Sequence, residues 1–330
     1  MSVTLDANAL RIDCDAEAQR IANALVAALQ ALRRRGLVVA MSGGVDSSVS
    51  AALAVKALGP DRVYGLLLPE NDSNPASEHR ARRVAEQLKM HFALEPIGAA
   101  LEALGCYRRR DEAIRRLFPD YGLAWKCKIA IAGGGEGGIN FFKLVVQSPQ
   151  GTVHERRLPI REYLEIVAAT SLKQRLRKVL EYYHADRLNF AVIGTPNRLE
   201  YDQGFFVKNG DGAADVKPIA HLYKTQVYAL ARHLGLPEEV CTAMPTTDTY
   251  SMVQSQDEFY FALRYDRMDA ALWALNHGIA ARTLAEYLGT DEAHASFIYD
   301  DIRRKRQATA YLHARPLLVE PVMEISDVPG

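Results

Sequence analysis

The segment that most constrains the fold is a short apolar run, residues 37–41, that leads directly into Ser42-Gly43-Gly44-Val45-Asp46-Ser47-Ser48. An apolar run of this length, bounded by turn-forming residues, is typical of a strand buried on both faces. A helical pattern then continues over residues 47–58. Glycines let the backbone turn so that successive N–H groups converge, and the following helix adds its positive N-terminal end. The segment therefore predicts a strand, an anion-binding loop and a helix.

Strands and helices alternate along most of the chain. Apolar runs predict further strands at residues 63–68, 91–96 and 189–194. Helical spacing of apolar residues predicts helices within residues 1–35 and at 76–89, 171–184 and 227–234. This alternation predicts an α/β fold with a doubly wound parallel sheet and helices on both faces.

Two stretches depart from this rhythm. A glycine-rich break at 133–138 is followed by a pattern typical of a β-hairpin, which indicates an insertion at about 133–164. From about residue 280 the chain is mostly helical and charged. We therefore expect one domain over residues 1–279 that carries the insertion, and a helical C-terminal extension over 280–330.

Composition excludes several classes of protein. With 48% apolar residues in 330, the chain can bury a full core, and its 40 basic residues balance its 40 acidic ones. A neutral chain has no global field to hold it on nucleic acid or anionic lipid, so we expect neither partner. The apolar runs are too short to cross a membrane and no basic-then-apolar leader is present, which predicts a cytoplasmic protein. The 4 cysteines form no CxxC pair, which argues against a zinc cluster.

The glycine loop carries groups suited to a magnesium–phosphate complex. Ser42, Ser47 and Ser48 supply hydroxyl donors, while Asp46 would repel a phosphate and is better placed to hold the Mg²⁺ that neutralises it. No Lys-Ser or Lys-Thr follows the glycines, so this is not a Walker loop. The alternative is an ordinary strand-to-helix turn capped by Asp46 or Ser47. The pattern SGGxDS after a strand resembles the loop of the ATP pyrophosphatase (PP-loop) superfamily, which grips the departing pyrophosphate.

A second block narrows the resemblance. The chain contains Gly194-Thr195-Pro196-Asn197-Arg198-Leu199-Glu200, then Gly204-Phe205-Phe206-Val207-Lys208-Asn209-Gly210-Asp211-Gly212, then Leu222-Tyr223-Lys224-Thr225. In order and spacing these motifs closely resemble the NAD synthetase family of the ammonia-dependent type. The resemblance extends over about residues 36–100 and 170–270, and it implies an adenine nucleotide alpha hydrolase-like fold.

The resemblance implies roles for individual residues. Glu200 would be the second Mg²⁺ ligand beside Asp46, and Lys208 would be the cation on the ATP phosphates, so these three are the expected catalytic residues. ATP would also contact the loop residues 42–48, Leu68, Thr195 and Thr246. The acceptor substrate would contact Lys173, Arg175, Arg177, Asp211 and Asp248. A solvated Glu200, a surface Lys208 and a solvated basic helix face are the alternatives.

The reaction implied by the resemblance is ATP-dependent amide formation. A carboxylate attacks the α-phosphorus of ATP, pyrophosphate leaves, and ammonia displaces AMP from the acyl-adenylate; the family's acid is deamido-NAD. The family also implies a homodimer, with ammonia free or supplied by a separate glutaminase. A tRNA-modifying pyrophosphatase and an inactive nucleotide-binding protein are the competing classes, disfavoured by neutral charge and by the presence of Asp46, Glu200 and Lys208.

Four departures from the family pattern lie on the acceptor side: Ser171, residues 257–260, the loop 249–256, and the insertion. A rebuilt pocket could accept a different carboxylic acid in a dedicated pathway, which is the main alternative. We expect the insertion to lie over the acceptor pocket, with Phe141 and Phe142 as an aromatic wall. Arg156, Arg157 and Arg161 would meet an anionic substrate. A surface hairpin or a dimer contact is the alternative for this segment.

Overall fold

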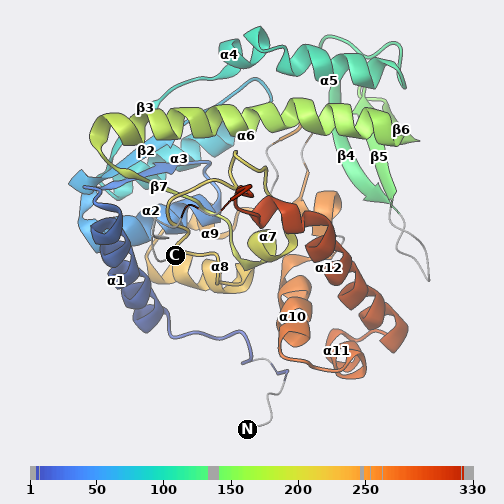
Figure 1. Cartoon of the computed structure of the whole chain (residues 1–330). Coiled ribbons are helices and arrows are strands. Elements are labelled where there is room, and N and C mark those ends of the chain that lie inside the picture. Colours follow the sequence, from blue (N-terminus) through green and yellow to red (C-terminus); the bar gives the residue numbers. More distant parts are fainter. Residues whose placement is uncertain are drawn as a thin grey trace.

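A computed structural model describes residues 5–6, 8–132, 141–245, 249–252, 254–261, 263–320 and 322. Its centre is a parallel sheet with the strand order β3-β2-β1-β7 (Figure 1). The strands are β1 (Leu37–Ala40), β2 (Val63–Leu67), β3 (His91–Leu94) and β7 (Ala191–Ile193). Leu37 pairs with Val63 on one side and Ala191 on the other, so the strand order reverses between β1 and β7. In doubly wound sheets, ligands bind at such a switch point, beyond the carboxyl ends of the strands.

Helices cover both faces of this sheet. The face presented by Leu37 and Val39 packs against helices α1 (Cys14–Leu32), α2 (Val45–Leu58), α3 (Pro75–Gln87), α8 (Lys224–His233) and α9 (Glu238–Cys241). The face presented by Val38 and Val192 packs against α4 (Gly98–Ala103), α5 (Cys106–Arg115) and the long α6 (Ile160–Leu188). A 3-10 turn, η1 (Pro60–Arg62), precedes β2. The predicted doubly wound α/β fold is confirmed.

Local sequence accounts for several helix ends. The Asp13 side chain accepts hydrogen bonds from two N–H groups in the first turn of α1, and Asn74 does the same for Ala76 at the start of α3. Pro75 occupies the first position of α3, where its missing N–H has no intrahelical partner to lose. Helix α6 ends where Asn189 adopts a left-handed conformation with φ 56°.

A second, antiparallel sheet in the order β4-β5-β6 lies beside the first. Its strands are β4 (Lys126–Ala132), β5 (Phe141–Gln147) and β6 (Val153–Arg157). The predicted hairpin corresponds to β5 and β6. Strand β4 was not predicted, and α6 begins at Ile160 rather than at 171. Buried side chains of the sheet, Ile129, Leu144 and Val146, pack against Ile166 of α6. The glycine-rich stretch 133–138 lies outside the described residues.

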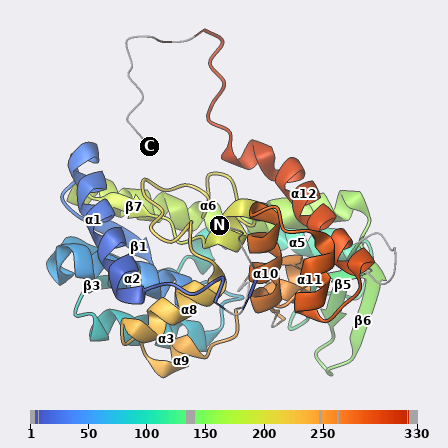
Figure 2. The same cartoon turned by 90° about the horizontal axis from the view of Figure 1, so that it is seen from below.

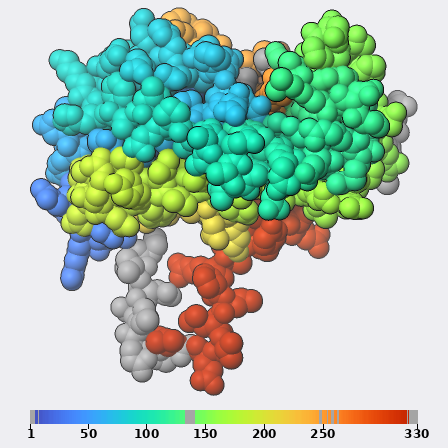
Figure 3. Space-filling model, turned by 90° about the horizontal axis from the view of Figure 1, so that it is seen from above, coloured from blue at the N-terminus to red at the C-terminus, as the bar shows by residue number. Residues whose placement is uncertain are grey.

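Besides α8 and α9, the chain beyond β7 forms further helices that pack around the end of the sheet. These are α7 (Arg198–Gln203), the π-turn η2 (Asp257–Phe261), α10 (Tyr265–Asn276), α11 (Ala281–Leu288) and α12 (Glu292–His313). Helices α10 to α12 share a core with Leu199 and Tyr223. The described residues after α12 stand away from the body (Figure 2 and Figure 3). Within the described residues, no helix is long and apolar enough to span a membrane.

Candidate active site

The loop between β1 and α2 is held open towards solvent by its own hydroxyl groups. Ser47 Oγ and Ser48 Oγ donate to the carbonyl of Gly44 at 3.1 and 2.8 Å, and Ser42 Oγ lies 3.0 Å from Ser47 Oγ. Gly44 is the N-cap of α2 and has no side chain to cap the helix. The first N–H groups of α2 are therefore available to an anion, as predicted for a phosphate loop.

Gly43 sets the shape of this loop. Its φ is +76°, and a Cβ at this position would lie 2.0 Å from the carbonyl oxygen of Ser77 in α3. Arg80, also in α3, donates its Nε to the Gly43 carbonyl at 3.0 Å. Only glycine fits here, because both the left-handed backbone and the close approach of α3 exclude a side chain.

Two carboxylates meet beside the loop through one asparagine. Asn197 Nδ2 donates to Asp46 Oδ1 at 3.1 Å, while the Asn197 backbone N–H donates to Glu200 Oε2 at 3.2 Å. Asn197 also caps α7, which carries Glu200, in a reciprocal capping box. The other Glu200 oxygen accepts from Gln256 Nε2 at 2.8 Å. The structure thus brings Asp46 and Glu200 together at the carboxyl edge of β1 and β7.

A buried lysine completes this centre. The Lys224 ammonium forms an ion pair with Asp46 Oδ2, and its side chain is 2% exposed. Burial opposes the charged form of Lys224, but Asp46 and Glu200 outweigh it and raise its pKa above the usual value. For Glu200, burial and then the charge of Asp46 raise the pKa to about 7, partly offset by Lys224. The repulsion between the two carboxylates makes the site favourable for a further cation.

Helix α10 fixes the position of Lys224. Asp269 accepts from the backbone N–H groups of Lys224 and Thr225 at 3.1 and 2.7 Å, and so caps the N-terminus of α8. Burial raises the pKa of Asp269 to about 7 although these N–H donors oppose the shift. The motif containing Lys224 is recognisable in the sequence, but no role was predicted for this lysine. The contacts of Asn197 and Gln256 were not predicted either.

A cavity of 890 Å³ opens over this centre. Most of the predicted site residues line it: Ser42, Gly44, Val45, Asp46, Ser47, Leu68, Arg175, Arg177, Thr195, Glu200, Lys208 and Asp211. Gly43 and Ser48 are buried behind the lining and shape the loop. Thr246 and Asp248 lie outside the described residues.

Three basic residues that line the cavity, Lys208, Arg175 and Arg177, contact backbone carbonyls. Lys208 Nζ donates to the carbonyls of Tyr311 and Ala314 at 2.7 and 3.2 Å, at the C-terminal end of α12. Arg175 Nε donates to the Lys208 carbonyl at 3.3 Å, and Arg177 Nε to that of Leu68 at 3.3 Å. These contacts position the three cations on the cavity wall. A role of Lys208 on the phosphates stays a prediction.

The expectation for Lys173 needs correction, whereas a substrate contact of Asp211 stays a prediction. Lys173 was expected to contact the substrate, but its side chain is 1% exposed and its ammonium contacts Glu70, Asp72 and Thr249 behind the cavity wall. Asp211 lines the cavity, yet its Oδ1 accepts from Val207 N–H at 2.7 Å and stabilises its own turn. Burial raises the pKa of Asp211.

The insertion contributes one aromatic residue to the cavity. Phe142 lines it and stacks on Tyr163 of α6, with ring centroids 4.5 Å apart. Phe141 lies outside the lining, where Arg157 stacks over its ring. The other two arginines of the predicted cationic surface also point elsewhere: Arg156 lies over Phe118 and Arg161 pairs with Glu165. The expectation that these three arginines meet an anionic substrate in the cavity is therefore wrong.

Comparisons with known proteins agree with this geometry. The family model described as NAD synthase matches residues 17–116 and 138–309. The chain is 58% identical to the NH(3)-dependent NAD(+) synthetase of Rhizobium meliloti (strain 1021) over 324 residues, which is 98% of this chain and 97% of the relative.

Two solved structures share the fold. The NH3-dependent NAD synthetase from Campylobacter jejuni in complex with the nitrate ion has a TM-score of 0.61 at 21% identity, covering 94% of this chain and 100% of that chain. The NMN synthetase from Francisella tularensis has a TM-score of 0.56 at 22% identity, covering 95% and 100%. Because the family model and a relative of high identity both span most of its length, the chain belongs to the NAD synthase family.

Proposed function

We propose that the chain is an ammonia-dependent NAD synthetase, which adenylates the nicotinate carboxylate of deamido-NAD with ATP and then forms the amide with ammonia. Its relative of 58% identity bears the name NH(3)-dependent NAD(+) synthetase. The observation that carries the chemistry is the centre of Asp46, Glu200 and Lys224 beside the open N-terminus of α2.

The residues of this centre suit the departure of pyrophosphate. The N–H groups of α2 and the Lys224 ammonium would bind the β- and γ-phosphates, where negative charge accumulates as the bond to the α-phosphorus breaks. Lys224 is pre-positioned for this by its capping partner Asp269. Ammonia then attacks the carbonyl of the acyl-adenylate, the C–O bond to AMP breaks, and the amide forms.

Asp46 and Glu200 are the residues that would hold Mg²⁺. They meet through Asn197, and burial, followed by the charge of Asp46, raises the pKa of Glu200; a cation would relieve the repulsion between the two carboxylates. Within the described residues, no group of three or more His, Cys, Asp and Glu side chains could hold a metal ion. Magnesium suits such a pair, because it commonly binds one or two carboxylates together with substrate phosphates. When bound, it neutralises phosphate charge.

Several finer properties belong to the same proposal. We propose a cytoplasmic homodimer whose domain spans residues 1–279, with a helical extension over 280–330. We also propose that ammonia arrives free or from a separate glutaminase. We propose that Lys208 contacts the ATP phosphates and that Arg175 and Arg177 bind the anionic part of the acceptor, since all three line the cavity.

A product-release assay tests the proposal. The purified chain is incubated with ATP, Mg²⁺ and ammonium, and with deamido-NAD or one of a panel of other acids that includes nicotinate mononucleotide. We expect AMP, pyrophosphate and NAD in equal amounts with deamido-NAD, and none from Asp46→Asn. If AMP and pyrophosphate were released with another acid and not with deamido-NAD, that acid would be the substrate, and the proposed activation by ATP would still hold.

A further inference from the structure

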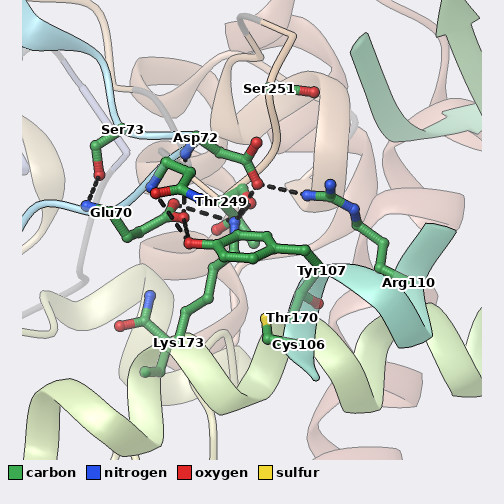
Figure 4. A network of polar contacts seen from close by, with 12 residues as sticks. Glu70, Asp72, Ser73, Cys106, Tyr107, Arg110, Thr170, Lys173, Thr249 and Ser251 are labelled. Atoms are coloured by element: carbon green, nitrogen blue, oxygen red, sulfur yellow. Dashed lines mark hydrogen bonds and ion pairs between the residues drawn. The ribbon is translucent and has the colours of Figure 1, made fainter. Parts of the chain in front are cut away.

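A buried polar cluster lies behind the wall of the cavity, formed by Glu70, Asp72, Tyr107, Arg110 and Lys173; we call it the Lys173 cluster. Figure 4 shows the Lys173 side chain extending from α6 into the middle of this group. Its ammonium donates to Glu70 Oε1 at 3.0 Å, Asp72 Oδ2 at 2.6 Å and the Thr249 carbonyl at 2.8 Å. An ammonium has three N–H donors, so Lys173 has none left for a ligand.

The rest of the cluster balances these charges. Tyr107 donates its hydroxyl to Glu70 Oε2 at 2.7 Å, and Arg110 Nη1 donates to Asp72 Oδ2 at 2.5 Å. Burial opposes ionisation of Asp72, but Lys173 and Arg110 outweigh it and lower its pKa below the usual value. Within the cluster two cations therefore face two carboxylates, and Arg110 also pairs with Asp111 at 2.8 Å at the edge of the cluster. Buried networks that are fully hydrogen-bonded in this way hold their members in one arrangement.

The cluster joins two separate walls of the cavity. Glu70 and Asp72 belong to the loop after β2, and Leu68, Pro69, Glu70 and Ser73 of that loop line the nucleotide end of the cavity. Thr249 begins a second segment, of which Thr249, Tyr250 and Gln256 also line the cavity. Lys173 is the residue whose ammonium contacts both segments.

The second segment has further anchors, among them hydrogen bonds from Gln254 Nε2 to the Ile129 carbonyl of β4 and from the Gln256 N–H to the Pro245 carbonyl at 3.1 Å. Met252 N–H donates to the Cys127 carbonyl at 3.1 Å, and Cys127 N–H donates to Ser251 Oγ at 2.9 Å, which attaches the segment to β4. At its end, Gln256 Nε2 donates to Glu200 Oε1 at 2.8 Å. A displacement of this segment from Lys173 would therefore be transmitted to a carboxylate of the catalytic centre.

We propose that Lys173 is a positioning residue that sets the distance between the 68–73 wall and the 249–256 wall, and so places Gln256 against Glu200. It acts without touching either substrate. The inference rests on the proposed function only in taking ATP as the ligand at the nucleotide end. Antiparallel strand β4 then has a role as well, because it also holds this segment through Cys127.

The test uses a charge-balanced variant, Lys173→Met combined with Glu70→Gln. The double change removes one cation and one anion, and the amide oxygen of the introduced glutamine can keep the hydrogen bond from Tyr107. Lys173→Met alone leaves two carboxylates with one cation and would lose more stability. The matched control is Arg116→Met, which removes ion pairs between the end of α5 and Glu162 and Glu165 of α6, away from both walls.

Hydrogen exchange and kinetics are measured on all variants. We expect the Met252 amide of the double variant to exchange roughly tenfold faster or more, because one anchor of its segment is lost. The KM for ATP should rise by a similar factor, and Arg116→Met should match wild type in both. A double variant that is less stable but keeps wild-type exchange at Met252 and wild-type KM would reduce Lys173 to a structural residue and overturn the proposal. Hydrogen exchange is measured without substrates, so it tests the role of Lys173 even if the wild type fails to catalyse the proposed reaction.

Discussion

Replacement of Gly43 by alanine tests whether the tight loop is required for ATP binding. The matched control is Gly289→Ala, because Gly289 also has a left-handed φ, +64°, but its Cβ would meet nothing within 4 Å. A left-handed alanine costs about 1–2 kcal/mol, so the control should lose about that much free energy of unfolding. At Gly43 the Cβ lies 2.0 Å from the Ser77 carbonyl, and relief requires α3 to move. Such overpacking adds about 1–3 kcal/mol.

The displacement of α3 should also appear in function. Arg80 of α3 holds the Gly43 carbonyl and lines the cavity, so movement of α3 changes the loop that would receive the phosphates. We expect Gly43→Ala to slow exchange of labelled pyrophosphate into ATP by about 100-fold, the cost of losing one pre-positioned donor. Gly289→Ala should keep wild-type exchange. Equal stability loss in the two variants, with normal exchange in Gly43→Ala, would refute the reasoning.

Three further changes examine the rest of the cavity. Lys224→Met should reduce pyrophosphate exchange by about 100-fold, because the cation beside Asp46 is lost; wild-type exchange would exclude Lys224 from that step. Burial raises the pKa of Asp269 to about 7 in the folded protein, whereas an unfolded Asp titrates near pH 4. Between about pH 4 and 7 only the folded state keeps this proton, so the free energy of unfolding falls as the pH rises. Asp269→Asn cannot titrate, so between pH 5 and 7 its free energy of unfolding, measured by urea titration, should fall by about 2 kcal/mol less than that of the wild type. The same fall in both proteins would contradict the raised pKa. Phe142→Ala should raise the KM for the acid and leave that for ATP unchanged; no change in either would separate the insertion from the acceptor.

The fold could be predicted because its signals are local. The strands β1, β2 and β7 are apolar runs, and Gly43 and Gly44 mark the turn after the first of them. Strand β4 was missed although its sequence alternates, with Lys126 and Lys128 on one face and Cys127 and Ile129 in the core. Its partner follows a stretch of glycines, so pairing with β5 depends on contacts that a short window of sequence does not contain.

The catalytic centre was predicted only in part, for a related reason. Asp46 and Glu200 stand in motifs, but the partner of Asp46 is Lys224, 178 positions away. Lys173 was expected to contact the acceptor by resemblance to the family, together with Arg175 and Arg177. Its burial results from acceptors at Glu70, Asp72 and Thr249, which only the folded chain brings together.

The helices α10 to α12 pack against the elements that carry the catalytic centre. Leu199 and Tyr223 are buried in the core of α10 to α12, and each is the immediate neighbour in sequence of a central residue, Glu200 or Lys224. Asp269 of α10 also caps the helix that begins with Lys224. Loss of this core would leave the glycine loop on β1 intact but would release both groups opposite it. The phosphate loop and its partners therefore depend on different parts of the chain, and binding of the nucleotide requires both parts to be folded.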